Sequence, residues 1–136
     1  MKIKHLLYIS LLMLMASCVK KLEELSYEKS LDRIIENIRK PYNGIIIDTI
    51  SYRKNLRATD MILSSGDTIF PTNGEVMKLI KIGDSVYKKG SDNFLYIQRK
   101  PTDKTLKLWY IKIPQKYRED DRFPMKWKGK WMDASE

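Results

Sequence analysis

The chain of 136 residues contains one cysteine, Cys18, and one histidine, His5, and these two side chains limit the chemistry that it can perform. A thiol can be acylated, oxidised or used as a nucleophile, and an imidazole is the usual general base and a frequent metal ligand. Both residues lie within the first 18 positions. The rest of the sequence therefore has no means of forming a histidine-containing catalytic triad, a cysteine–histidine pair or a histidine-ligated zinc site.

The first 17 residues have the three parts of a secretory signal peptide. Met1–His5 is positively charged, residues 6–15 form an apolar run, and Ala16 and Ser17 are small residues of the kind that precede a cleavage site. The apolar run is shorter than the roughly 20 residues that a membrane-spanning helix needs. Removal of this segment leaves 119 residues and lowers the net charge from +9 to +7. A chain of that length can bury one modest core.

The run Met15-Ala-Ser-Cys18 resembles the lipobox of bacterial lipoproteins, in which the cysteine sulfur receives a diacylglyceryl group and the cysteine becomes the acylated N-terminus. The resemblance implies cleavage between Ser17 and Cys18 and attachment to a lipid bilayer, because several acyl chains anchor a protein stably. A signal peptide followed by a free or buried thiol is the alternative. Val19 and Lys20 lack the aspartate that retains many lipoproteins in the inner membrane. The outer membrane is therefore favoured, with its periplasmic face and the cell surface both open.

Between Lys20 and Lys40, apolar residues recur at spacings that predict an amphipathic helix. They are Leu22, Leu25, Leu31, Ile34, Ile35 and Ile38. Pro41 and Asn43-Gly44 predict the end of this helix. A helix that packs on its own domain is favoured, and a heptad helix that pairs with another envelope protein is the alternative. Residues 18–43 are thus expected to form the lipidated N-terminus and a helical tether.

Residues 44–113 are rich in β-branched and aromatic residues, and turns containing Gly or Asp interrupt them about every 8 to 12 residues. Strands are predicted at 45–52, 58–63, 68–70, 85–88 and 93–99 and from Leu106 onward. The spacing of Thr72 and Glu75 is that of a capping box and predicts a short helix. The turn at 89–92 is expected to need Gly90 at positive φ. This pattern predicts a mainly β (α+β) fold, a small antiparallel barrel-like or curled sheet preceded by one amphipathic helix.

The segment Ile80-Lys-Ile-Gly-Asp-Ser-Val-Tyr-Lys-Lys-Gly-Ser-Asp92 is similar to an element of small uncharacterised Bacteroidota-type lipoproteins. The similarity extends from Ser51 to Arg99 and implies a compact, lipid-tethered, mostly β domain. It implies no enzymatic activity, cofactor or metal. We therefore expect a non-enzymatic binding or assembly module of the cell envelope, with an envelope protein or a glycan as its partner.

Three Asp-Ser/Thr-aliphatic triplets place Thr49, Thr68 and Ser85 in sequences that resemble the O-glycosylation acceptors of the same bacterial group. An Asp that ends a turn before a β-branched strand produces the same triplet for structural reasons. Both interpretations of the triplets stay open at this point.

The last segment, residues 114–136, is basic and aromatic, and lysines alternate with tryptophans between Lys126 and Trp131. Trp127, Trp131 and Tyr110 are candidates for contact with a glycan or an anionic lipid surface. The favoured alternative is that the two tryptophans fold back over the sheet, because Trp prefers burial. The positive charge is spread along the chain and no nucleic-acid-binding motif is present, so a nucleic-acid ligand is not expected.

Overall fold

A computed structural model of the protein describes residues 2–51 and 60–135, and it divides into two compact units, residues 1–33 and 34–136. The predicted loop at 53–57 and the first two residues of the strand predicted from Ala58 lie outside the described residues. Six strands and short helices make up the second unit, which confirms the mainly β (α+β) class.

The first unit is helical, and its helix α1 (Lys2–Arg39) continues into the second unit. The helix thus begins well before Lys20, because the apolar run and the small residues after it are also helical. Leu22 and Leu25 are 66% and 45% exposed, whereas Ile34, Ile35 and Ile38 are buried in the second unit. The favoured packing of the helix on its own domain is therefore confirmed for its last turns. None of the helices described is both long and apolar enough to cross a membrane.

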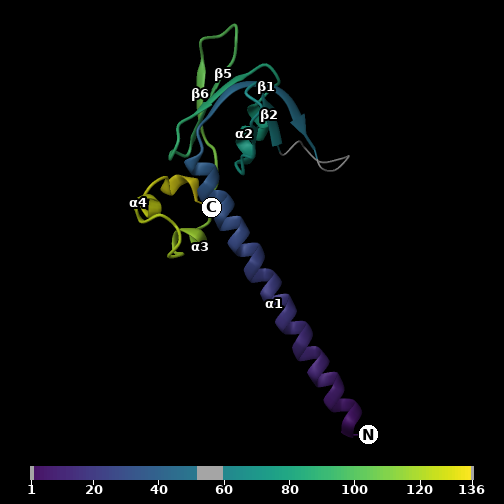
Figure 1. Cartoon of the computed structure of the whole chain (residues 1–136). Helices are drawn as coiled ribbons and strands as arrows, with labels where there is room; N and C mark the ends of the chain where they lie inside the picture. Colours follow the sequence, from purple (N-terminus) through teal and green to yellow (C-terminus); the bar gives the residue numbers. More distant parts are fainter. Residues whose placement is uncertain (1, 52–59, 136) are drawn as a thin grey trace. The chain divides into compact units, whose positions relative to one another are not determined.

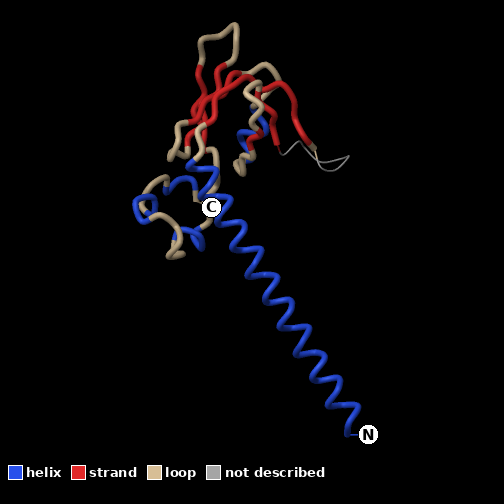
Figure 2. The backbone as a smooth tube through the Cα atoms, in the orientation of Figure 1, coloured by secondary structure: helices blue, strands red, loops and turns tan. Residues whose placement is uncertain are grey.

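The strands, drawn in red in Figure 2, belong to one antiparallel sheet. Their order in the sheet is β3-β2-β1-β4-β5-β6. Their bounds are β1 Tyr42–Ile50, β2 Asp60–Leu63, β3 Thr68–Ile69, β4 Ser85–Lys88, β5 Phe94–Gln98 and β6 Thr105–Trp109. Among the described residues, β3 and β6 are not paired with each other. The sheet is therefore the curled form of the prediction and not a closed barrel.

Strand β1 gives the sheet its curvature. It pairs with β4 through its first residues and with β2 through its last, and a register shift lies between Ile46 and Asp48. Such an irregularity bends the strand, and β1 arches over α2 (Gly74–Leu79) in Figure 1. Helix α1 ends at Arg39, just before Pro41, as predicted, and β1 begins at Tyr42, three residues before the predicted strand, so Gly44 lies inside β1. A Cβ at Gly44 would come within 3.1 Å of the Leu63 Cβ, which explains why a glycine is found there.

Helix α2 is the predicted short helix, but its N-cap is Asn73 and not Thr72. The Asn73 side chain accepts a hydrogen bond from the Glu75 N–H (3.1 Å) and donates one to the Trp109 carbonyl (2.7 Å). The side-chain amide of Asn73 has both a donor and an acceptor. It therefore caps α2 and at the same time links α2 to the end of β6. The Thr72 hydroxyl instead accepts from the Lys112 N–H at 2.7 Å.

The turn between β4 and β5 also differs from its prediction. The residue at positive φ is Ser91 (φ 57°), and Gly90 is required for a different reason. A Cβ on Gly90 would lie 3.1 Å from the Arg39 carbonyl oxygen, so the glycine allows the turn to approach the end of α1. The preceding turn does need a glycine at positive φ, because Gly83 has φ 95°.

The buried carboxylate of Asp84 explains the Gly-Asp-Ser element. Arg99 donates to both oxygens of Asp84 through Nε (2.8 Å) and Nη2 (2.7 Å), and the Lys81 N–H donates at 2.8 Å. The hydrogen bond from Arg99 holds the pKa of Asp84 below its usual value. The same Arg99 Nη2 donates to the Leu79 carbonyl. Asp84 therefore joins the ends of β4, β5 and α2, which is a structural role.

The segment expected to be a basic aromatic tail is folded. It contains α3 (Gln115–Arg118), α4 (Met125–Lys128) and a 3₁₀ turn, η1 (Met132–Ala134). The buried guanidinium of Arg118 holds them together by donating to the Ser135 hydroxyl (2.8 Å) and to the carbonyls of Lys130 (2.6 Å) and Trp131 (2.5 Å). Five potential donors on one side chain make arginine suited to such a junction.

Candidate functional site

The aromatic residues predicted to bind a surface ligand are mostly interior. Tyr110 and Trp127 are buried, and Trp131 is half-buried. Trp127 packs against Phe123 and Trp131, at ring-centroid distances of 6.1 and 5.8 Å. The prediction of a binding surface is therefore wrong for Tyr110 and Trp127, because packing in the fold leaves no ring face for a ligand. The burial that the alternative predicts is found for Trp127, whose ring neighbours Phe123 and Trp131 belong to the C-terminal segment.

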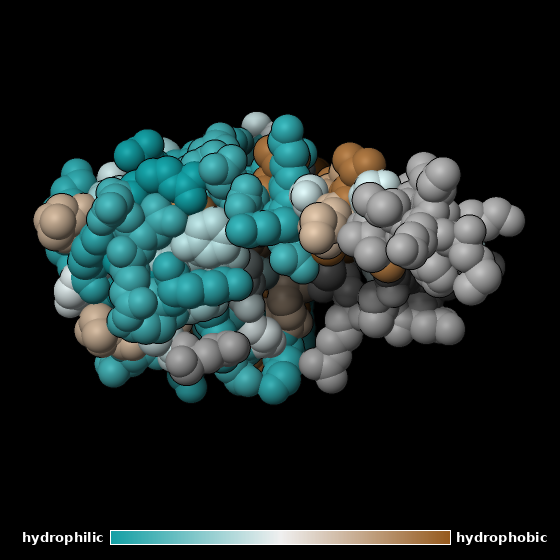
Figure 3. Space-filling model, turned by 90° about the horizontal axis from the view of Figure 1, so that it is seen from below, coloured by the Kyte–Doolittle hydropathy of each residue, from teal (hydrophilic) through white to brown (hydrophobic). Residues whose placement is uncertain are grey.

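Hydrophilic residues cover most of the surface seen in Figure 3, and hydrophobic residues occur there singly or in small groups. A ligand-binding surface must therefore be sought from particular clusters of side chains. Two clusters in the second unit stand out, a buried polar cluster behind the sheet and an aromatic face on its other side.

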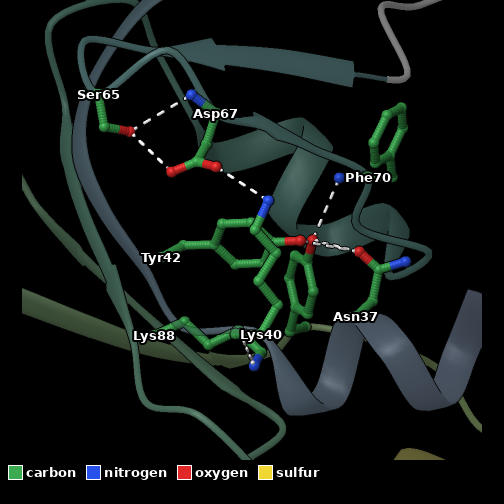
Figure 4. Close-up of polar contacts among 8 residues, drawn as sticks. Asn37, Lys40, Tyr42, Ser65, Asp67, Phe70 and Lys88 are labelled. Atoms are coloured by element: carbon green, nitrogen blue, oxygen red, sulfur yellow. Dashed lines mark hydrogen bonds and ion pairs between the residues drawn. The ribbon is translucent and has the colours of Figure 1, made fainter.

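The buried polar cluster is centred on Lys88, whose side chain is fully buried (Figure 4). Its Nζ donates to the carbonyls of Ile38 (2.8 Å), Lys40 (2.8 Å) and Lys89 (3.1 Å). The rings of Tyr42 and Tyr110 lie close to Nζ, with centroids 5.8 and 5.6 Å from it, and the two centroids are 5.8 Å from each other. Carbonyls at a helix C-terminus lack partners within the helix and carry partial negative charge, so an ammonium stabilises them.

Burial lowers the pKa of Lys88 from 10.5 to about 8. A lysine with a lowered pKa is a potential nucleophile, but a nucleophile must reach its substrate. The amine of Lys88 is enclosed by protein and all three of its protons have acceptors. Its geometry therefore indicates a structural role, in which β4 is fixed to the end of α1.

Hydrogen bonds extend the cluster to α1 and to the residue that follows β3. The Tyr42 hydroxyl donates to Asn37 Oδ1 at 3.0 Å, and the Tyr110 hydroxyl accepts from the Phe70 N–H at 3.1 Å. At its rim Lys40 forms an ion pair with Asp67 at 2.9 Å, and this contact lowers the pKa of Asp67 and raises that of Lys40. The cluster thus connects α1, β1, β4 and the β2–β3 turn.

The other side of the sheet carries a different set of residues, which we call the outer face. It consists of alternate residues of the last three strands and of Asn43 and Ile45 in β1, and these residues point away from the buried set that includes Val86, Lys88, Leu95 and Ile97. The cross-strand pairings place them in rows: Phe94 beside Trp109; Asn43, Tyr87, Tyr96 and Lys107; and Ile45, Ser85, Gln98 and Thr105. Aromatic, amide, hydroxyl and ammonium groups therefore lie side by side.

An open depression of about 620 Å³ lies over two of these rows. Its lining comprises Asn43, Ser85, Val86, Tyr87, Lys89, Tyr96, Gln98 and Thr105. Tyr87 is 43% exposed, and its ring lies 6.0 Å from that of Tyr96 at an angle of 40°. A concave surface with aromatic walls and a few polar groups is the usual form of a small-ligand site.

A second depression, of about 490 Å³, borders the first along β6. The stacked rings of Phe94 and Trp109 contribute to its lining, with centroids 4.2 Å apart. The Lys107 Nζ lies 3.8 Å from the Phe94 ring centroid and 5.9 Å from that of Tyr96. Lys107 therefore contacts the aromatic groups of both depressions.

The three candidate glycosylation residues, Thr49, Thr68 and Ser85, are half-buried residues of strands β1, β3 and β4. For Ser85 the preceding Asp84 has the structural function described above. Ser85 also lines the larger depression. Modification of the three residues stays a prediction.

Comparison with known proteins adds no assignment: no family model matches the chain, and neither a curated protein nor a solved structure is found to be similar to it. Within residues 2–51 and 60–135, no group of three or more His, Cys, Asp or Glu side chains is placed to hold a metal ion. The outer face is therefore the candidate functional site on its geometry alone.

Reasoning from the sequence missed both clusters, although a signal for each was present. Period-2 alternation in Ser85–Lys88 places Lys88 on the same side as Val86, and it places Tyr87 on the side of Ser85. The same alternation in Phe94–Gln98 aligns Phe94, Tyr96 and Gln98. What was absent from the sequence was the register that brings these strands together.

Proposed function

We propose that the protein is a lipid-anchored, non-enzymatic binding module of the bacterial cell envelope, and that it binds its ligand on the outer face. The observation that carries the binding role is the cluster of half-exposed aromatic rings and polar side chains on β4, β5 and β6. The lipid anchor is supported by the Met15–Cys18 run and by the exposed position of the Cys18 thiol. The outer membrane remains the favoured location.

Lipidation is tested by metabolic labelling with a fatty-acid analogue. We expect the wild-type chain to carry the label and Cys18→Ser to lose it completely, because Cys18 has the only thiol of the chain. The matched control is Ser17→Ala, which keeps a small residue before the cleavage point and is expected to retain the label. Undiminished labelling of Cys18→Ser would contradict the anchor.

A second candidate role is favoured by one observation. Leu22 and Leu25 of α1 are exposed, and exposed leucines at helical spacing suit a partner helix of another envelope protein. In this role the protein would be a structural component of the envelope.

Cross-linking in living cells separates the two roles. A photoreactive amino acid is placed at Tyr87 on the outer face or at Leu22 on α1, and Met125 in α4, which is 78% exposed, serves as the control position. We expect adducts from Tyr87 and none from Met125. Adducts from Leu22 alone, each with one discrete protein, would instead support the pairing role and refute binding through the outer face.

A further inference from the structure

The side chains of the outer face define the chemistry of the ligand that they can bind. We propose that this face binds an acidic glycan, with sugar rings against Tyr87 and Tyr96 and the acidic groups near Lys89 and Lys107. The inference rests on the proposed binding function and extends it to a ligand class.

The aromatic residues provide flat apolar area. Tyrosine and tryptophan side chains offer large, rigid contact areas at a low cost in conformational entropy, because each has only two χ angles. The negative face of such a ring attracts the weakly positive C–H groups of a sugar ring. The Tyr87–Tyr96 pair and the Phe94–Trp109 pair occupy neighbouring rows, two residues apart along β5. Two residues of a strand span about 7 Å, so an extended oligosaccharide can contact both pairs.

The polar side chains of the larger depression have hydrogen-bonding capacity to spare. In the described structure, the side chains of Asn43, Ser85, Gln98 and Thr105 make no hydrogen bond to protein, whereas the buried Asn73 and Asn93 use theirs on backbone groups. Amides and hydroxyls both donate and accept, as the hydroxyl groups of a sugar do. Four such groups around two aromatic rings match a polyhydroxylated ring better than a purely apolar ligand.

The charge of the depression favours an acidic ligand. Lys89 lines it, and no carboxylate is among its lining residues. Lys107 belongs to the smaller depression, whose lining also includes Lys112 and two carboxylates, Asp133 and Glu75, the latter paired with Lys78. Complementary charge steers a ligand to its site and excludes ligands of the wrong sign. A glycan with carboxylate groups can pair with the two lysines, form hydrogen bonds with the amide and hydroxyl side chains, and stack on the aromatic rings. A lipid surface has fewer hydroxyl groups, so it would leave more of the amide and hydroxyl side chains without hydrogen-bond partners.

The test measures dissociation constants of the full chain in detergent by titration calorimetry. The acidic probes are oligogalacturonate and hyaluronan oligosaccharide, and the neutral probe is methyl-esterified oligogalacturonate, which keeps the sugar rings and loses the charge. We expect both acidic probes to bind, and oligogalacturonate to bind about tenfold more tightly than its ester. Vesicles of phosphatidylglycerol are the competing anionic surface and are expected to bind no better than vesicles of phosphatidylcholine.

Variants locate the binding on the outer face. Tyr87→Ala is expected to weaken oligogalacturonate binding about tenfold and Lys107→Gln about threefold to tenfold, as for anchor residues of an interface. Lys126→Gln removes the same charge from α4 and is expected to leave binding unchanged. Since Lys107 is exposed, its substitution leaves packing intact even if Tyr87→Ala reduces folding.

Each contrary outcome is decisive. Failure of both acidic probes to bind, equal binding of the methyl ester, or binding to phosphatidylglycerol vesicles alone would overturn the acidic-glycan inference. The proposed function fails separately, by the absence of adducts from Tyr87 in cells. A protein adduct at Tyr87 together with no binding of the acidic probes would leave the binding function standing and refute the glycan.

Discussion

Lys88→Ala is expected to lower the free energy of unfolding of the second unit by about 3 to 5 kcal/mol. The substitution opens a cavity where a fully buried four-carbon chain had packed. It also leaves the carbonyls of Ile38, Lys40 and Lys89 without their shared donor. Urea unfolding followed by tryptophan fluorescence measures the change.

Lys88→Met is the matched control, because its four-atom apolar side chain replaces the stem of Lys88 up to Cε and lacks the ammonium group. Its expected loss at pH 7 is about 1 to 2 kcal/mol, the contribution of the hydrogen bonds to the three carbonyls. A loss in Lys88→Met as large as that in Lys88→Ala would show that packing contributes nothing and would contradict the cavity argument.

The pH dependence of stability provides a second readout on Lys88. Its pKa is about 8 in the fold and 10.5 in the unfolded chain. Between these pH values the unfolded chain binds the additional proton, so the stability of the wild type rises with pH relative to that of Lys88→Met. We expect the free energy of unfolding of the wild type, relative to that of Lys88→Met, to rise by about 2 kcal/mol between pH 7 and pH 10. An equal pH dependence of stability in both proteins would refute the inference that burial lowers the pKa of Lys88.

Trp127→Ala is expected to destabilise the second unit by about 3 to 5 kcal/mol, because it removes a buried indole that packs against Phe123 and Trp131. Arg39 also loses an aromatic face, since its Cζ lies 6.0 Å from the Trp127 ring centroid. The free energy of unfolding in urea is again the measurement.

Met125→Ala in the same short helix is the control for Trp127, since its side chain is exposed, and a change within about 0.5 kcal/mol is expected. If Trp127→Ala were as stable as the wild type but lost ligand binding, the tryptophan would belong to a surface site after all. If Trp127 has a structural role, Trp127→Ala should still bind oligogalacturonate at temperatures where it is folded.

Much of the fold was accessible from local patterns. Period-2 alternation and the Gly- and Asp-containing turns predicted most of the strands and the short helix at 74–79, because these signals act between residues close in the chain. The errors arose where contacts between distant parts of the chain decide the role of a residue. Gly90 was assigned to positive φ, whereas its neighbour Ser91 adopts it and Gly90 is needed for an approach to Arg39, which is distant in the sequence.

The candidate site was predicted less well than the fold. The aromatic residues near the C-terminus are close together along the chain, but closeness along the chain does not bring side chains together on one surface of the fold. Tyr87 and Tyr96 are nine positions apart and become neighbours only through the pairing of β4 with β5. Trp109 reaches Phe94 in the same way, across β5 and β6.

By itself, the sequence determined the lipobox-like run at Cys18, the helical period before Lys40 and the alternation that sorts each strand into two sides. Only the tertiary structure decided which side became interior. Alternation along a strand does not indicate which of its two sides will face the core. In this fold the end of α1 lies on the side of Val86 and Lys88. Lys88 donates a hydrogen bond there to the Ile38 carbonyl, which is 50 residues away in the sequence. Covering that side buried a lysine and left Tyr87, Tyr96 and Lys107 on the other, because only one side of each strand packs against the core.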